Sequence, residues 1–339
     1  MLLLAFVGFG VAAWADESKV CGAPAALKDG WTVAAQADVG LDATKLCGLD
    51  AFIDRWPQAN IHAVVVVRNG KLVMERYFSG EDERWRDKLG HVTYGPEVKH
   101  DLRSISKSVT SLLVGIALSE GKFPALESSV LDAFPDYADL RTSEKSRIAF
   151  RDLLTMSSGL EWDENRPWTD PRNNERGMMM ATDPFRYILS QPVAFAPGTF
   201  YAYSGGDTSL LGETLVRSTG RPLRDYARDK LFLPIDAPDF EWLDVGVSHR
   251  LGAFGGLRMR PRDAAKLGRL LLTDGQWNGK QLVPPGWATE SIKPRINSQD
   301  TYSYGYQWWL GRSPPQRRRD HLGGRLRLGR PALVRRAGA

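Results

Sequence analysis

A β-hairpin is the strongest local signal in this 339-residue sequence. Residues 61–68 are rich in β-branched side chains, Asn69-Gly70 can form a two-residue turn, and residues 72–78 return as a second strand. Residues 302–310 are rich in aromatic side chains and predict another strand. Because strands lie near both ends and helical patterns lie between them, we predict an α+β fold in which the terminal strands pair in one antiparallel sheet.

Helical periodicity begins close to Ser104. Apolar side chains recur at helical spacing from Val109 to Ile116, and Gly121 ends the run. This pattern predicts one buried helix that starts near Ser104. Further helical patterns lie at 150–156, at 208–219 and after Pro261.

Composition and charge exclude several classes of protein. With 42% apolar and 25% charged residues, the chain has the composition of a globular protein. Beyond the N-terminus no apolar run reaches the roughly 20 residues of a membrane-spanning helix, which excludes a polytopic membrane protein. Residues 311–339 hold nine arginines and one acidic residue, a net charge of +8. Since the whole chain carries +5, the rest of it carries about −3. We therefore expect no nucleic-acid partner.

The N-terminal segment predicts export. Residues 1–15 (MLLLAFVGFGVAAWA) resemble a secretory signal peptide with cleavage after Ala15, although the usual positive charge before the apolar run is missing. We expect a periplasmic or secreted protein with no membrane attachment after cleavage, and the alternative is a buried N-terminal helix. The only cysteines, Cys21 and Cys47, would form a disulfide in an oxidising compartment or remain two unrelated thiols.

The C-terminal segment 311–339 differs sharply from residues 16–310, which we interpret as one domain. It alternates arginine, glycine and leucine, with almost no acidic residue and no periodic apolar face. A basic arm for anionic partners is one interpretation. We favour a shifted reading frame, because the composition changes abruptly, and resequencing the coding DNA tests this interpretation.

Ser104 and Lys107 carry the main chemical signal. At the start of a helix, Ser-x-x-Lys places a hydroxyl and an amine on the same face, one turn apart. The unpaired N–H groups and the dipole of a helix N-terminus can stabilise a developing negative charge. As a base Lys107 must be neutral, so the pattern predicts a pKa lowered from ~10.4 toward 7 by burial or a neighbouring cation. A second match, Ser119-x-x-Lys122, straddles the predicted helix end, where its side chains would diverge.

Two further segments follow Ser104 in a specific order. Residues 153–160 read LLTMSSGL, and residues 197–206 read PGTFYAYSGG before a Leu-Leu-Gly at 210–212. With Ser-x-x-Lys they resemble the serine β-lactamase and penicillin-binding-protein superfamily, most closely its class C branch, which holds esterases, D-aminopeptidases and 6-aminohexanoate-oligomer hydrolases. The resemblance covers roughly residues 31–311. It implies an antiparallel sheet flanked by helices, with an all-helical lobe inserted between the terminal strands.

The resemblance also implies roles for individual residues. Ser104 would be the acylated nucleophile, Lys107 its proton partner, and Tyr203 the tyrosine that relays a proton to the leaving group. We prefer Tyr203 to Tyr201 because the family's tyrosine stands six residues after the proline of the Pro-Gly-Thr turn. Gly205 stands where an asparagine is common. Its lack of a side chain removes an amide that could hold a substrate's acylamino group, which argues against β-lactam or peptide recognition.

A late strand is the third element that the resemblance implies, and its backbone N–H would complete the oxyanion hole. His321-Leu322-Gly323-Gly324 could be this strand and contact substrate. It lies in the anomalous tail, however, and a shifted frame would make the match accidental. Trp308 is a further candidate to border the substrate pocket, although sheet packing explains it equally well.

Other candidate residues are less specific. Residues 162–180 hold aromatic and methionine side chains that could line the site or fill the core. The five histidines show no H-E-x-x-H or comparable spacing, and two cysteines cannot form a zinc knuckle. We therefore expect neither a metal nor a cofactor.

These observations predict an exported serine hydrolase that cleaves a small-molecule ester or amide through an acyl-enzyme on Ser104. Lys107 and Tyr203 would move the proton as a coupled pair, and the sequence does not decide which of them is the base. Two alternatives stay open. One is a β-lactamase or D,D-peptidase, and the other is a catalytically inactive binding or sensor protein on the same scaffold.

Overall fold

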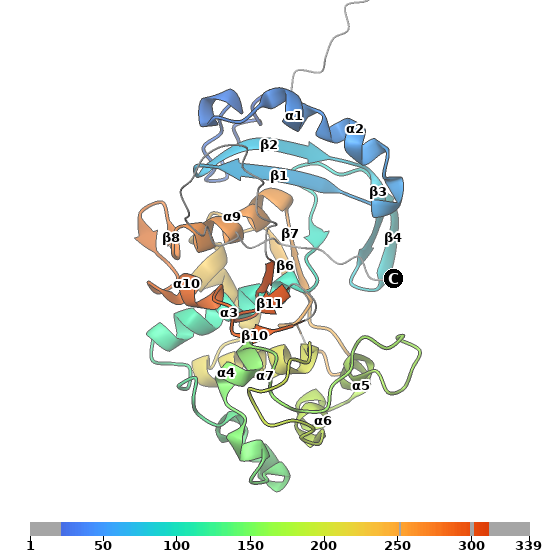
Figure 1. The fold of residues 1–339 in the computed structure, drawn as a ribbon, viewed down its shortest axis with the longest axis vertical. Helices are drawn as coiled ribbons and strands as arrows, with labels where there is room; N and C mark the ends of the chain where they lie inside the picture. Colours follow the sequence, from blue (N-terminus) through green and yellow to red (C-terminus); the bar gives the residue numbers. More distant parts are fainter. Residues whose placement is uncertain (1–21, 251, 299–301, 312–339) are drawn as a thin grey trace, which may run out of the picture.

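The computed structural model describes residues 22–250, 252–298 and 302–311 (Figure 1). The predicted signal peptide, Cys21 and residues 312–339 lie outside this part of the chain, so export, the disulfide to Cys47 and the nature of the tail stay predictions. Within the described part, no helix combines the length and the apolar character needed to cross a membrane.

The described strands are short, and they pair with one another in antiparallel fashion. β1–β2, β3–β4 and β8–β9 form two-stranded sheets, and the orders β5–β7–β6 and β10–β11–β12 form three-stranded sheets. The strands are Ala63–Arg68 (β1), Lys71–Tyr77 (β2), Gly80–Arg84 (β3), Asp87–Val92 (β4), His100–Asp101 (β5), Phe240–Trp242 (β6), Leu257–Met259 (β7), Gln276–Trp277 (β8), Lys280–Gln281 (β9), Ile296–Asn297 (β10), Tyr302–Tyr304 (β11) and Trp309–Gly311 (β12).

Most of the described helices lie between β5 and β6 in the sequence. The α-helices are Ala43–Cys47 (α1), Leu49–Asp54 (α2), Ile105–Ser119 (α3), Phe150–Leu154 (α4), Asn174–Met180 (α5), Pro184–Ser190 (α6), Gly205–Thr219 (α7), Leu223–Ala227 (α8), Pro261–Leu272 (α9) and Trp287–Ser291 (α10). Short 3₁₀ or π turns lie at Ala37–Val39, Pro57–Ala59, Val130–Ala133, Pro135–Leu140, Lys145–Arg147 and Arg228–Phe232.

The predicted hairpin is confirmed in β1 and β2. Arg68 pairs with Lys71, and the turn residues Asn69 and Gly70 have φ values of 52° and 75°. Asparagine and glycine tolerate this left-handed conformation best, which is why the pair marks the turn in the sequence. α9 packs against β1, and α1 and α2 lie on the opposite side of the hairpin (Figure 1).

The predicted helices are also confirmed, with small shifts at their ends. α3 begins after Ser104, and Gly121 follows its end with a φ of 66°. α9 begins at Pro261, whose fixed φ suits the first position of a helix. α7 starts at Gly205, earlier than its apolar pattern predicted, because the Ser204 side chain accepts a hydrogen bond from the Asp207 N–H and caps the helix there.

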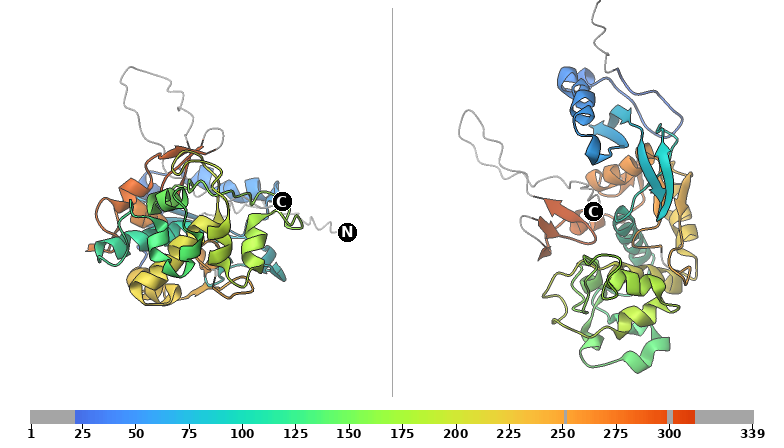
Figure 2. Two further views of the ribbon diagram at one scale, coloured as in Figure 1. Left: turned by 90° about the horizontal axis from the view of Figure 1, so that it is seen from below. Right: turned by 90° about the vertical axis from the view of Figure 1, so that its right-hand side faces the viewer.

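Helices between β5 and β6 form a lobe that includes α4 to α7 (lower half of Figure 1). α3 lies between this lobe and the strands, where it contacts α7 on one side and α10 on the other. The side view in Figure 2 shows the same division into a strand-containing part and a helical lobe. The architecture therefore confirms the α+β fold with an inserted helical lobe.

Two predictions about strands were wrong. Residues 302–310 are not one strand, because the chain turns between β11 and β12, where Gln307 has a φ of 64° and is buried. Within the described residues, the terminal strands do not share one sheet. The two edges of β11 pair with β10 and β12, and β1 pairs with β2 instead.

Candidate active site

Ser104 is the N-cap residue of α3, and it is exposed. Arg103, directly before it, has a φ of 46°, a conformation that is uncommon and costly for a residue other than glycine. Contacts of the Arg103 guanidinium with the Glu83 carboxylate and the Trp85 carbonyl oxygen hold this backbone conformation. The strained residue places the Ser104 hydroxyl at the mouth of the helix.

Lys107 lies one helical turn beyond Ser104 and is only 2% exposed. Its Nζ donates hydrogen bonds to the Ser104 Oγ at 3.3 Å and to the Phe254 carbonyl oxygen at 2.9 Å. The same Nζ lies 4.8 Å from the centre of the Tyr203 ring. The fold thus brings together the hydroxyl, the amine and the phenol that the sequence motifs suggested.

The charge state of Lys107 differs from the prediction. Burial alone would lower its pKa, as the sequence analysis required, but the negative charges of Tyr203, Glu164 and Glu175 outweigh burial and raise the pKa above its ordinary value. Lys107 is therefore an ammonium group at neutral pH. An ammonium donates protons in hydrogen bonds and has no lone pair with which to accept one.

Tyr203 and Tyr201 lie in different surroundings. Tyr203 is half-buried, and its ring packs 5.6 Å from the Trp309 ring and 6.4 Å from the Tyr304 ring. Tyr201 is 9% exposed and belongs to a small buried cluster with Met156 and Tyr304. Burial raises the pKa of Tyr201 far above its usual range. The preference for Tyr203 therefore agrees with its place against the Lys107 ammonium.

The second Ser-x-x-Lys match does not form a comparable pair. The Ser119 Oγ donates to the Ile116 carbonyl oxygen at 2.7 Å, while the Lys122 Nζ forms an ion pair with Glu120 at 2.9 Å. The two side chains diverge at the end of α3, as predicted.

Gly205 is the first residue of α7 and is buried. Its N–H donates a 2.6 Å hydrogen bond to the Oε2 of Glu164, a residue that the sequence analysis did not single out. Burial raises the pKa of Glu164 to about 7, although the positive charge of Lys107 acts to lower it. The missing asparagine at position 205 is the one sequence signal that this region differs from the family pattern.

Trp308 is 4% exposed and lies in the main hydrophobic cluster. Its neighbour Trp309 is the residue that contacts Tyr203, so a substrate-binding role for Trp308 stays a prediction. His321, Gly323 and Gly324 lie outside the described residues, and their roles stay predictions too.

The methionine and Trp168 side chains of the segment 162–180 pack against other parts of the protein. Met178 and Met179 are 0% and 4% exposed and fill the core, as the alternative interpretation had it. Trp168 lies under the Arg86 guanidinium, whose central carbon is 3.3 Å from the ring centre. Arg86 also forms an ion pair with Glu175 at 3.7 Å. These contacts join the turn between β3 and β4 to the helical lobe.

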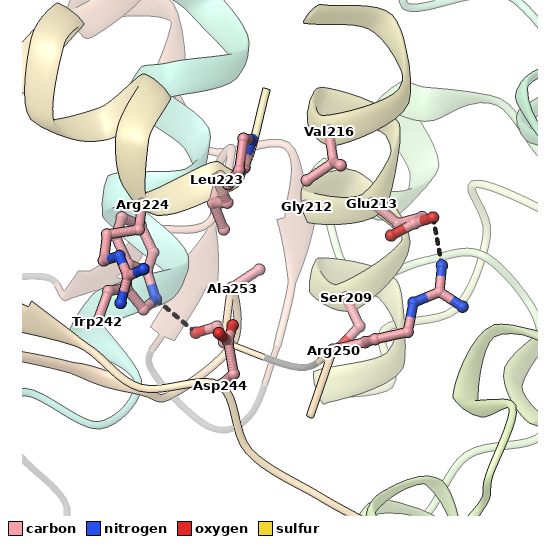
Figure 3. A pocket seen from close by; sticks show the side chains of 12 residues that line it. Ser209, Gly212, Glu213, Val216, Leu223, Arg224, Trp242, Asp244, Arg250 and Ala253 are labelled. Atoms are coloured by element: carbon pink, nitrogen blue, oxygen red, sulfur yellow. Dashed lines mark hydrogen bonds and ion pairs between the residues drawn. The ribbon is translucent and has the colours of Figure 1, made fainter. Parts of the chain in front are cut away.

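A cavity of about 210 Å³ lies on another side of α7 (Figure 3). Glu213 of α7 and Arg250 form a 2.7 Å ion pair at its edge. None of Ser104, Lys107 and Tyr203 is among the described residues that line it, so this cavity is separate from the candidate active site. Its lining consists of Ser209, Gly212, Glu213, Val216, Pro222, Leu223, Arg224, Trp242, Asp244, Arg250, Gly252 and Ala253.

Comparisons with known proteins agree with these motifs. The model of the β-lactamase family matches residues 54–332. A 6-aminohexanoate-dimer hydrolase from Paenarthrobacter ureafaciens is 23% identical over 80% of this chain and 71% of its own length. A D-aminopeptidase from Brucella abortus strain S19 is 29% identical over 55% of this chain, but the match spans only 34% of that longer protein.

Solved structures show the same fold at low sequence identity. A penicillin-binding protein from Bacillus halodurans superposes with a TM-score of 0.57 and 15% identity, covering 78% of this chain and 84% of its own. A β-lactamase/D-alanine carboxypeptidase from Pseudomonas syringae superposes with a TM-score of 0.58 and 17% identity, covering 78% and 75%. The chain belongs to the β-lactamase family, within the superfamily of serine hydrolases that its motifs resemble.

Proposed function

We propose that this hydrolase cleaves an ester or amide bond of a small molecule through an acyl-enzyme on Ser104. The observation that carries the proposal is the 3.3 Å contact between the exposed Ser104 hydroxyl and the buried Lys107 amine, beside the Tyr203 ring. A nucleophile within hydrogen-bond reach of proton-transfer groups is the arrangement that covalent catalysis requires.

Acylation begins with proton transfer from Ser104 to Tyr203. The Lys107 ammonium already donates to the Ser104 Oγ and the Phe254 carbonyl oxygen, so it cannot take the proton. In its ionised form, Tyr203 accepts the hydroxyl proton while Oγ bonds to the substrate carbonyl carbon. The carbonyl oxygen becomes an oxyanion, which the positive end of α3 stabilises.

The acyl-enzyme then forms and is hydrolysed. Tyr203 passes its proton to the leaving alcohol or amine as the bond from that group to the carbonyl carbon breaks. Water attacks the ester carbon and gives one proton to Tyr203. Tyr203 returns this proton to the Ser104 Oγ when the acid leaves.

Two observations bear on the substrate. Gly205 provides no side-chain amide to hold an acylamino group, which favours esters or simple amides over β-lactams and peptides. The two curated relatives are named for the hydrolysis of 6-aminohexanoate dimers and for aminopeptidase activity. Hydrolysis of p-nitrophenyl esters without hydrolysis of nitrocefin is the expected result, and the reverse preference would favour the β-lactamase alternative.

A fluorophosphonate probe tests the nucleophile. We expect one adduct on Ser104, located by mass spectrometry, and none on the variant Ser104→Ala. The variant Tyr203→Phe should slow labelling by about 10²- to 10⁴-fold, because it removes the group that accepts the proton. If folded wild-type protein gives no adduct, the hydrolase mechanism is wrong and an inactive binding protein on this scaffold is the better description.

A further inference from the structure

The carboxylate of Glu164 occupies the space beside Gly205 that a side chain would fill. A Cβ at position 205 would lie 3.3 Å from the Glu164 Oε2 and 3.1 Å from the Phe254 Cδ2. Both distances are shorter than ordinary contacts, so this place is taken. The Phe254 ring also lies 5.3 Å from the Lys107 Nζ, which puts the same place next to the catalytic amine.

Two neutral donors hold Glu164 there. Its Oε2 accepts hydrogen bonds from the Gly205 N–H at 2.6 Å and from the Trp162 Nε1 at 2.8 Å. Gly205 is the first residue of the 15-residue helix α7, whose positive end favours an anion. The carboxylate is therefore fixed in position while its charge remains unneutralised by these partners.

Several titratable groups face Glu164. The positive charge of Lys107 from α3 and the negative charge of Glu175 from α5 act on it, and Glu164 in turn acts on Tyr201 and on Tyr304 of β11. Tyr203 belongs to the same group, since its charge acts on both Lys107 and Tyr304.

Glu164 and Glu175 differ in how far their charges are offset. Glu175 forms an ion pair with Arg86 at 3.7 Å, so part of its charge is balanced locally. Glu164 has neutral hydrogen-bond donors instead, and it raises the pKa of Lys107 more than Glu175 does. Glu164 is thus the carboxylate that acts most directly on the catalytic amine.

We propose that Glu164 is a positioning residue for acylation. Its carboxylate lies beside Gly205, in the space that a side chain at this position would fill, and it holds Lys107 in the ammonium form. Tyr203 is then the group that accepts the Ser104 proton. This inference rests on the proposed function. It also explains how the site can operate with glycine at a position where the family commonly has asparagine.

The pH dependence of acylation follows from this arrangement. Burial raises the pKa of Glu164 to about 7, so the carboxylate gains its charge as the pH rises through neutrality. Below that pH Lys107 is an ammonium whether or not Glu164 is ionised, so the Glu164 charge matters at alkaline pH, where it delays the loss of the Lys107 proton. Acylation should fall at alkaline pH, where Lys107 loses its proton.

The test measures the rate of fluorophosphonate labelling of Ser104 from pH 5 to pH 10. In Glu164→Gln we expect the alkaline fall to move to lower pH by about 1 to 3 units, because a nearby negative charge is gone. The matched control Glu175→Gln should move the alkaline fall less, because Arg86 balances part of the Glu175 charge. Circular dichroism and the Tm show that each variant is folded.

Trp162→Phe provides a second control. It removes a neutral donor to Glu164 but leaves the carboxylate charge, so the alkaline fall should stay near its wild-type pH. Glu164→Asp, whose shorter side chain withdraws the carboxylate, takes the place of Glu164→Gln if that variant does not fold, and it should move the alkaline fall in the same direction. A wild-type pH profile in folded Glu164→Gln or Glu164→Asp overturns the positioning role, whereas a wild-type protein that is never labelled overturns the proposed function instead.

Discussion

Asp207 shows how burial of a single carboxyl makes stability depend on pH. The residue lies in the first turn of α7, is 1% exposed, and burial raises its pKa from 3.8 to about 8. Between these two pH values, the folded state binds one proton more than the unfolded state does at this site. By linkage, this carboxyl's contribution to the free energy of unfolding falls as the pH rises, by up to about 1.4 kcal/mol per pH unit.

The variant Asp207→Asn tests this prediction. The amide cannot ionise, so the variant should lack this dependence and gain stability relative to wild type as the pH rises from 5 to 8. Urea unfolding at several pH values measures the difference between the two proteins, in which the contributions of other groups largely cancel. Parallel stability curves would mean that Asp207 titrates at an ordinary pKa.

At the scale of elements, close helix contacts depend on particular glycines. Gly115 lies in the middle of α3, where an added Cβ would come 2.4 Å from the Trp287 ring of α10. The Trp287 Nε1 donates to the Ser111 carbonyl oxygen of α3 at 3.0 Å, which fixes the ring against the helix. Gly268 of α9 is different, since a Cβ there would meet no atom of the described residues within 4 Å.

Alanine substitutions at these two glycines should have opposite effects. Gly115→Ala should destabilise the protein by roughly 1 to 3 kcal/mol, because the methyl group overlaps the Trp287 ring. Gly268→Ala should stabilise it by up to about 1 kcal/mol, because alanine has the higher helix propensity and room is available. Thermal unfolding monitored by circular dichroism measures both, and a stabilising Gly115→Ala would show that the two helices are not in contact.

At the scale of the whole molecule, Gln307 ties the C-terminal turn to three helices. Its side-chain amide donates to the Leu153 carbonyl oxygen at 2.8 Å and accepts from the Thr208 hydroxyl at 2.7 Å. Its backbone carbonyl oxygen accepts from the Ser108 hydroxyl at 2.8 Å. α4, α7 and α3 therefore meet at one residue, which is 2% exposed.

Replacing Gln307 with methionine should have a large effect on stability. Methionine has a similar volume but leaves the Thr208 hydroxyl and the Leu153 carbonyl oxygen without this buried partner, so the free energy of unfolding should fall by about 2 kcal/mol or more. Thr208→Val breaks only one of these hydrogen bonds and should cost less. Urea unfolding ranks the two variants, and an equal or larger loss in Thr208→Val would contradict the role assigned to Gln307.

The sequence predicted the elements of the fold better than their assembly. The hairpin at Asn69-Gly70 and the helix that starts after Ser104 are both present, because turn residues and helical periodicity act over a few positions. The segment 302–310 was wrongly predicted as one strand, since its turn depends on the buried contacts of Gln307 with distant helices. The expected pairing of the terminal strands was also wrong within the described residues, because strand pairing depends on segments that are far apart in the sequence.

The sequence by itself determined the chemical groups of the candidate site, because Ser104 and Lys107 lie one turn apart on any helix that begins there. Only the tertiary structure decided the charge of that lysine and the presence of Glu164 beside Gly205. A pKa depends on burial and on charges brought in from remote segments, and neither is encoded in local spacing. The sequence motif predicted a neutral Lys107 amine. Lys107 is instead held as an ammonium once the helical lobe is folded against it.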